Sequence, residues 1–123
     1  MLNIIKLAVG IEDIDHLAEV QKHRLADSQA ANGKKAQLWH RTRHGPRRAE
    51  ELLDGGSMYW VIKGRIAARQ RLLGFASEAD EEGRKYCFIM LDPELVPTAP
   101  RRQRAFQGWR YFPGMDVPPD QPK

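Results

Sequence analysis

Apolar and polar residues follow one another along the chain in blocks that predict two elements near its start. Residues 3–9 are rich in isoleucine, leucine and valine and contain one charged residue, Lys6, which predicts a buried strand. Residues 11–27 place apolar side chains at helical spacing and carry acids in the first turn, which predicts an amphipathic helix. The polar residues 28–35 contain an Asn-Gly pair and predict a loop.

A proline and a pair of glycines bound the next predicted helix. Pro46 suits the first helical position of 46–54, because the N–H that it lacks has no partner there in any case. Gly55 and Gly56 follow, and glycine readily adopts the left-handed conformation that ends a helix. We therefore expect Gly55 to have a positive φ or to end the helix directly. The aromatic and β-branched residues at 58–62 predict a strand that is buried on both faces.

The second half of the chain has the pattern of strands. Residues 65–75 allow a helix through their alanines, but alternating apolar residues and arginines favour a strand. Acidic residues and a glycine at 80–83 predict a turn, and a strong strand follows at 86–91. A last strand is expected at 106–112, and the proline-rich residues 113–123 predict a flexible tail.

Together these elements predict one α+β domain at 1–112. Two helices and several consecutive strands favour a small curled antiparallel sheet or a barrel, flanked by the helices. Trp60 and the single cysteine, Cys87, lie in apolar runs and are expected to be buried, and one cysteine excludes an intramolecular disulfide. The chain has neither an apolar run long enough to span a membrane nor the pattern of a signal peptide, so we expect a cytoplasmic protein without a membrane partner.

Positive charge is concentrated in two stretches of the chain. The net charge is +4, but residues 34–71 hold ten Lys/Arg against three Asp/Glu, and residues 101–110 hold four arginines and no acid. Clustered charge of one sign creates a local field that attracts an anionic partner. We expect the basic residues at 41–48 to form one surface with at least part of 101–110.

The basic stretches contain the residue types that bind RNA. Arginine neutralises phosphates, aromatic rings stack on unpaired bases, and the first N–H groups of a helix favour an anion. The candidate residues for RNA or nucleotide contact are Arg41, Arg43, Arg47, Arg48, Lys63, Arg69, Trp109 and Arg110. The turn that contains Gly55, Gly56 and Ser57 is expected to line an adjoining pocket.

Other functions have weaker support in the sequence. His40 and His44 share a face if their segment is helical, but zinc needs further ligands and the neighbouring arginines repel a cation, so we expect no metal site. The chain has no phosphate-loop or dinucleotide fingerprint, and we expect no cofactor. Two alternatives to RNA or nucleotide binding stay open: a protein-interaction or assembly domain with an acidic partner, and a hydrolase-like enzyme that acts on a nucleotide.

Several of these segments resemble known families. Residues 48–64, 68–70 and 106–111 resemble an alphaproteobacterial family classified as a domain of unknown function, and the opening at 4–10 fits it too, so the resemblance covers nearly the whole chain. A more distant resemblance connects residues 50–63 with the helix–glycine–strand segment of PUA-like domains, which include the ASCH and EVE domains. This second resemblance implies a small barrel that binds RNA or a modified base.

Overall fold

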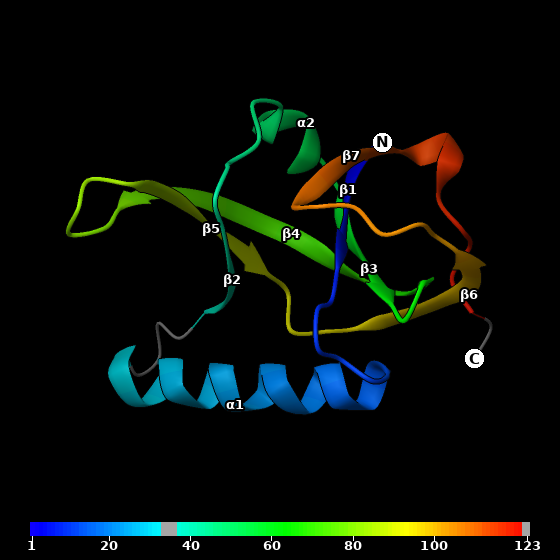
Figure 1. The fold of residues 1–123 in the computed structure, drawn as a ribbon, viewed down its shortest axis with the longest axis horizontal. Helices are drawn as coiled ribbons and strands as arrows, with labels where there is room; N and C mark the ends of the chain where they lie inside the picture. The colour runs from blue at the N-terminus through cyan, green and yellow to red at the C-terminus, as the bar shows by residue number, and fades with distance from the viewer. Residues whose placement is uncertain (33–36, 122–123) are drawn as a thin grey trace.

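The computed structural model describes residues 1–32 and 37–121 (Figure 1). The strands are β1 (Leu2–Leu7), β2 (Leu38–Thr42), β3 (Ser57–Ile62), β4 (Arg65–Ala79), β5 (Lys85–Leu91), β6 (Val96–Arg102) and β7 (Trp109–Pro113). The helices are α1 (Ile14–Asn32), α2 (Ala49–Leu52) and the 3-10 turn η2 (Gly114–Asp116). None of the described helices is both long and apolar enough to cross a membrane.

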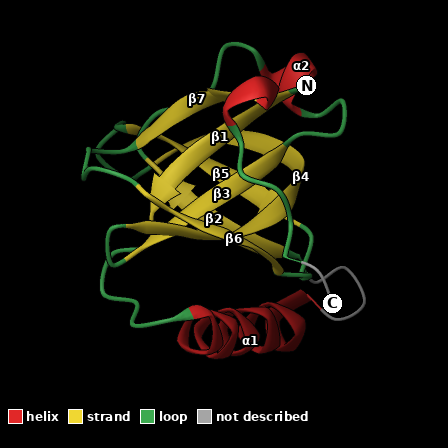
Figure 2. Cartoon of the chain, turned by 90° about the vertical axis from the view of Figure 1, so that its right-hand side faces the viewer, coloured by secondary structure: helices red, strands yellow, loops and turns green. Residues whose placement is uncertain are grey.

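All seven strands belong to one curled sheet, with β6 beside the main strand order β2-β5-β4-β3-β1-β7. The long strand β4 organises the sheet, because it pairs with β3 along one side and with β6 and then β5 along the other. The pairing of β1 with β3 is parallel and the others are antiparallel. Figure 2 shows the strands curling around a common interior with α1 below them, and β2 and β7 remain as open edges.

Apolar side chains cover both faces of the sheet. The larger cluster lies inside the curl and joins Ile4 and Met58 of the sheet to Leu17 of α1. The smaller cluster lies on the opposite face and contains Tyr59 and Val61. β3 contributes to both clusters because its side chains alternate in direction and all six of its residues are buried. A small α+β fold with a curled sheet agrees with the prediction, but the sheet is mixed rather than antiparallel, because β1 pairs in parallel with β3, and it stays open rather than closing into a barrel.

Two strands were not predicted, because their sequences lack an apolar pattern. β2 buries only Leu38 and Thr42 and carries polar or aromatic residues between them. His40 therefore lies in a strand and His44 beyond its end, so the prediction of a shared helix face is wrong. β6 contains two prolines, which cannot donate to a ladder, and the sheet accommodates them because β6 pairs with β4 along one side.

The first helix is longer than predicted. α1 runs to Asn32, whereas the sequence pattern ends near residue 27. The start of the predicted loop at 28–35 is therefore helical, and residues 33–35 of that loop lie outside the described part of the chain. Ser28 is buried here, and its hydroxyl accepts a hydrogen bond from the N–H of Gln37 at 3.2 Å, which connects the helix to the start of β2.

The second helix is shorter than predicted and begins at Ala49 rather than at Pro46. The N–H groups of Arg47 and Arg48 donate to the hydroxyl of Tyr111 on β7, at 3.0 and 3.1 Å. These residues therefore lie in a non-helical approach to the helix, and one turn of α2 remains.

Four local predictions are confirmed. Residues 65–75 form a strand and lie within β4. Gly55 follows the last turn of α2 with a φ of +88°. Trp60 and Cys87 are buried, with 3% and 2% of their surface exposed. Burial also raises the pKa of the Cys87 thiol, which makes it a poor nucleophile.

The segment 113–121, which the sequence predicts to be a flexible tail, lies along the sheet. The backbone N–H of Ala99 in β6 donates to the carbonyl of Pro119 at 2.8 Å. Asp120 forms a bidentate ion pair with Arg69 of β4, with both N–O distances at 2.7 Å. Prolines cannot donate hydrogen bonds, but their carbonyls accept them, so a proline-rich segment can still be held against a strand.

Candidate functional site

The structure places the predicted RNA-contacting residues in several places rather than in one surface. The first place holds Arg47, Arg48 and Trp109, the second holds Gly55, Ser57 and Arg69, and the third holds Lys63. Gly56 lies against the backbone of Leu2 and Leu52, and Arg43 is exposed beyond the end of β2. Arg41 and Arg110 lie exposed on the edge strands β2 and β7. These places differ in how many of their polar groups are already hydrogen-bonded within the protein.

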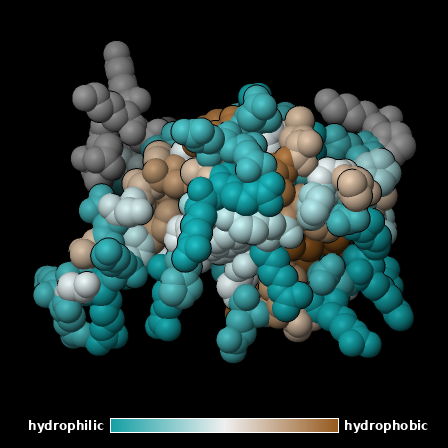
Figure 3. All heavy atoms as spheres, turned by 90° about the horizontal axis from the view of Figure 1, so that it is seen from above, coloured by the Kyte–Doolittle hydropathy of each residue, from teal (hydrophilic) through white to brown (hydrophobic). Residues whose placement is uncertain are grey.

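The first place is the contact between α2 and β7. The Trp109 indole N–H donates to the carbonyl of His44 at 2.7 Å, and the ring packs edge-on against Tyr111 with centroids 4.9 Å apart. The Tyr111 hydroxyl already accepts from the N–H groups of Arg47 and Arg48. Basic residues thus adjoin β7, but the N–H groups and the Trp109 ring are engaged within the protein. Figure 3 shows the face of the molecule that carries α2 and β7, and this face is largely hydrophilic.

The second place is a hollow of about 390 Å³ beside the C-terminal segment. The N–H of Ser57 donates to the Asn3 side chain at 2.9 Å, and its hydroxyl accepts from Arg69 at 3.1 Å. The Nε and Nη2 groups of Arg69 donate to the carboxylate of Asp120. These hydrogen bonds hold the pKa of Asp120 below its usual value. The polar groups of Ser57, Arg69 and Asp120 are therefore bonded within the chain itself.

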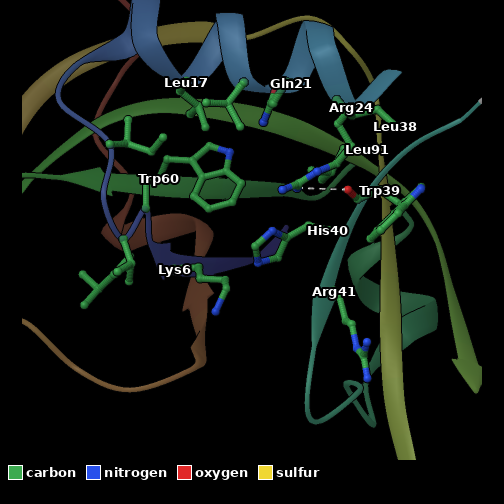
Figure 4. A pocket seen from close by; sticks show the side chains of 15 residues that line it. Lys6, Leu17, Gln21, Arg24, Leu38, Trp39, His40, Arg41, Trp60 and Leu91 are labelled. Atoms are coloured by element: carbon green, nitrogen blue, oxygen red, sulfur yellow. Dashed lines mark hydrogen bonds between the residues drawn. The ribbon is translucent and has the colours of Figure 1, made fainter. Parts of the chain in front are cut away.

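A more distinctive pocket lies at the opening of the curled sheet, between β1, β2 and α1 (Figure 4). Its volume of about 280 Å³ is near the lower end of the range for ligand sites, roughly 300–1,000 Å³. Aliphatic residues of all three elements form its walls, and Trp60 lies at its back. Its charged lining residues are Lys6, Arg24 and Arg41, and no Asp or Glu is among the lining residues.

Lys6 of β1 lines this pocket. It shares a face with Ile4 and lies in register with Trp60 of β3, so strand alternation directs its side chain inside the curl. Among the described residues Lys6 forms no ion pair. Burial lowers the pKa of its ammonium group, because the charged form loses hydration. A partly buried cation without a counterion among the described residues loses hydration that an anionic group at the same place would compensate.

His40 projects from β2 into the same space. Its ring meets Trp60 edge-on, with centroids 5.2 Å apart, and Figure 4 shows it between Lys6 and Trp60. The Nε2 atom of His40 is buried and has no hydrogen-bond partner within the described part of the chain. Burial, together with the charges of Lys6 and Arg24, lowers the pKa of His40 to about 4. The imidazole is therefore neutral at pH 7, and its buried Nε2 atom is left without a hydrogen-bond partner among the described residues.

A buried amide network holds the back wall of the pocket. The Gln70 side-chain carbonyl accepts from the Trp60 indole N–H and from the Gln21 amide, both at 2.8 Å. The Gln70 amide donates in return to Gln21 at 2.8 Å and to the carbonyl of Asp92 at 3.1 Å. Because these groups are buried and mutually satisfied, the network fixes the Trp60 ring and attaches α1 to the sheet beside the pocket.

The sequence predictions did not include the pocket residues Lys6, Arg24 and Trp39, and they considered His40 only as a metal ligand. One signal was present, since Lys6 is the single charge within an apolar strand. No comparable signal marks Arg24 or Trp39, because their approach depends on β2, which the pattern did not predict. Within the described residues, no three His, Cys, Asp or Glu side chains are placed to hold a metal ion.

The stability of the protein is expected to fall as the pH decreases from about 6.5 to about 4. Over this window His40 is protonated in the unfolded chain but neutral in the folded one, so the unfolded state binds more protons. The expected loss from His40 is on the order of 3 kcal/mol. Urea unfolding at a series of pH values measures it. His40→Leu should remove this part of the pH dependence, whereas His44→Leu, an exposed histidine, should keep it. Equal profiles for both variants would contradict a buried neutral imidazole.

Comparison with known proteins identifies the family of this chain. The model of the family described as protein of unknown function (DUF1489) matches residues 4–123. The chain belongs to the DUF1489 family. No significant match was found to a curated protein or to a solved structure. The match confirms the resemblance to a family with a domain of unknown function, and the DUF1489 region includes both pocket strands from Ile4 onward, with Lys6 and His40 inside it.

The pocket of this DUF1489 protein is better suited to binding than to acid–base chemistry. No carboxylate lines it, and a histidine with a pKa of about 4 is a weak base at pH 7. The cations at its rim favour an anion, while the aliphatic walls and the Trp60 edge favour a flat apolar group. A ligand with an anionic end and a planar end matches both features.

Proposed function

We propose that this protein binds a nucleotide, either free or as one unit of a single-stranded RNA, in the pocket between β1, β2 and α1. The observation that supports this most is the position of Lys6, whose side chain lines a pocket with no Asp or Glu among its described lining residues. A phosphate would supply the counterion that the chain does not provide. The distant resemblance of residues 50–63 to PUA-like domains also supports the proposal, because that resemblance implies binding of RNA or a modified base.

The rest of the pocket complements a base. The faces of a base are apolar and its edge carries donors and acceptors, so aliphatic walls suit the faces and the neutral imidazole of His40, which lines the pocket, suits the edge. Arg24 adds a second cation beside Trp39, with its guanidinium carbon 5.6 Å from the ring centroid. The volume of about 280 Å³ suits one small ligand rather than a large cofactor.

Exposed arginines next to the pocket support the same class of ligand. Arg41 lines the pocket rim, lies over the Tyr86 ring at 3.9 Å, and is followed by the exposed Arg43. Exposed charges of one sign raise the local concentration of anions and accelerate their binding. We therefore expect binding to weaken as the ionic strength rises.

Lys6→Met is expected to weaken nucleoside monophosphate binding about 30-fold, which corresponds to roughly 2 kcal/mol. Methionine keeps the length and apolar contacts of the side chain and removes the charge. Isothermal titration with the four ribonucleoside monophosphates and their nucleosides measures the effect. The wild-type protein should prefer monophosphates to nucleosides, and Lys6→Met should lose this preference.

Lys22→Met is the matched control, because Lys22 is exposed on α1 outside the pocket. Lys22→Met should bind nucleoside monophosphates as tightly as the wild-type protein does. Lys6→Met should also be at least as stable as the wild-type protein, since it removes a partly buried unpaired charge. If the wild-type protein binds no nucleotide, or if both variants bind equally well, the pocket does not have the proposed function.

A further inference from the structure

The turn between β3 and β4 has a conformation that lysine rarely adopts. Ile62 pairs with Arg65, so Lys63 and Gly64 form a two-residue hairpin turn. Their φ angles are +49° and +79°, and Lys63 is the only non-glycine residue with a positive φ in the described part of the chain. Asparagine or aspartate is favoured before glycine in such turns. Lysine at this position is therefore unfavourable for the turn itself.

A second unfavourable arrangement lies directly beside this turn. Arg65 of β4 is the pairing partner of Arg102 of β6. Like charges directly opposite each other on neighbouring strands destabilise a sheet. The N–H of Gln103 donates to the carbonyl of Gly64 at 2.9 Å, which keeps the segment after β6 against the turn. The fold thus holds cations together where their mutual repulsion acts against it.

These residues surround a surface hollow that has no acid in its lining. The hollow has a volume of about 540 Å³ and is lined by Lys63, Gly64, Arg65, Arg102, Gln103 and Arg104. Lys63 forms an ion pair with Glu12, but both side chains are mostly exposed, at 62% and 66%, so water competes effectively for this contact. The three arginines form no ion pair with a described acid. We call Lys63, Arg65, Arg102 and Arg104 the turn cluster.

The chain connects the turn cluster with the pocket between β1, β2 and α1 along one edge of the sheet. After Arg104 the chain passes Phe106, which packs against the smaller core cluster, as does Leu7 of β1, a lining residue of that pocket. Arg110 lies over the Phe106 ring at 4.6 Å. β7 then pairs with β1 so that Trp109 is opposite Lys6. Basic and aromatic residues therefore continue from the cluster to the pocket strand.

We propose that the turn cluster binds the phosphate backbone of a single-stranded RNA, one nucleotide of which occupies the pocket at Lys6. This inference rests on the proposed function and extends it, because it makes an RNA strand rather than a free nucleotide the ligand. Arginine binds phosphate through two parallel N–H groups, and a strand of phosphates offsets the repulsion between Arg65 and Arg102. Phe106 and Arg110 lie along the path of the strand between the two sites.

The test compares the triple variant R65Q/R102Q/R104Q with the wild-type protein. The probes are a fluorescein-labelled 12-nucleotide RNA of mixed sequence and an unlabelled ribonucleoside monophosphate. RNA affinity should fall on the order of tenfold, since three exposed charge contacts are lost. The slope of log affinity against log salt should decrease by roughly 2, at about 0.7 for each lost phosphate contact. Monophosphate affinity should not change.

The control is K22Q/R84Q/K85Q, which removes the same charge from exposed positions on α1 and the β4–β5 hairpin. If both triple variants bind RNA equally, the turn cluster has no specific role, while monophosphate binding would still support the pocket. If the wild-type protein binds neither probe, the proposed function fails and this inference fails with it. Removing like charges should not unfold the sheet, and a denaturation midpoint at or above that of the wild type verifies this.

Discussion

Replacing Gly56 with alanine is expected to lower the free energy of unfolding by about 4 kcal/mol. A Cβ atom at this position would lie well inside 3.0 Å of the carbonyl oxygens of Leu2 and Leu52, a separation that real Cβ atoms essentially never show. Both oxygens belong to the backbone, so no side chain can rotate away. Relief requires β1 or the end of α2 to move.

Such a movement would also break hydrogen bonds at the same point. The Gly56 N–H donates to Leu52 at 2.9 Å, and the Gly56 carbonyl accepts from Leu72 of β4 at 3.0 Å. Glycine is therefore required here by close approach of the backbone, whereas Gly55 is required by its positive φ. Urea unfolding of Gly56→Ala, followed by circular dichroism, measures the loss.

Gly83→Ala is the control for this prediction. Gly83 has a φ of +79°, but a Cβ atom there would meet nothing within 4 Å. Alanine at position 83 should therefore cost only the left-handed backbone strain, about 1 kcal/mol. A loss for Gly56→Ala as small as that for Gly83→Ala would contradict the close approach.

Trp60→Ala is expected to lower the free energy of unfolding by about 3–5 kcal/mol. Trp60 is 3% exposed and belongs to the larger core cluster, so its removal leaves a cavity. It also removes the indole N–H from the amide network of Gln70 and the ring that His40 contacts edge-on. The denaturant midpoint measures the stability, and nucleotide titration of the remaining folded protein measures the damage to the pocket wall.

Trp60→Phe separates the packing of the ring from its hydrogen bond. Phenylalanine keeps an aromatic ring in the core but cannot donate to Gln70, whose carbonyl still accepts from Gln21. The loss of one hydrogen bond should cost about 1 kcal/mol, plus a smaller packing term. A loss below about 1 kcal/mol for Trp60→Ala would show that the ring is not a core residue.

The apolar pattern predicted the elements whose burial is regular. β1, β3, β4 and β5 were identified because their residues are apolar on one face or on both, and that pattern needs only near neighbours in sequence. The burial of Trp60 was predicted from the same pattern, and the positive φ of Gly55 from the tendency of glycine to end a helix. β2 and β6 were missed because they are strands by pairing with their neighbours, not by their own composition.

The candidate site was less predictable than the fold. The arginines at 41–48 drew attention through their charge, but Arg48 is paired with Glu51 and the N–H groups at the start of α2 are taken by Tyr111. The pocket instead depends on Lys6 and His40, which come from strands that are distant in the chain. Lys6 has one signal in the sequence, as the single charge of an apolar strand, but the role of both residues depends on the side chains that surround them in the folded protein.

The sequence by itself determined the α+β class, the positions of the main strands along the chain, the end of the helix before β3 and the excess of positive charge. These properties follow from composition and local periodicity, which act over a few residues. The tertiary structure alone decided that β1 and β2 approach each other across the open curl, that the C-terminal segment lies on β6, and that Arg65 faces Arg102. Such contacts depend on the free energy of packing between distant segments, which no local pattern records.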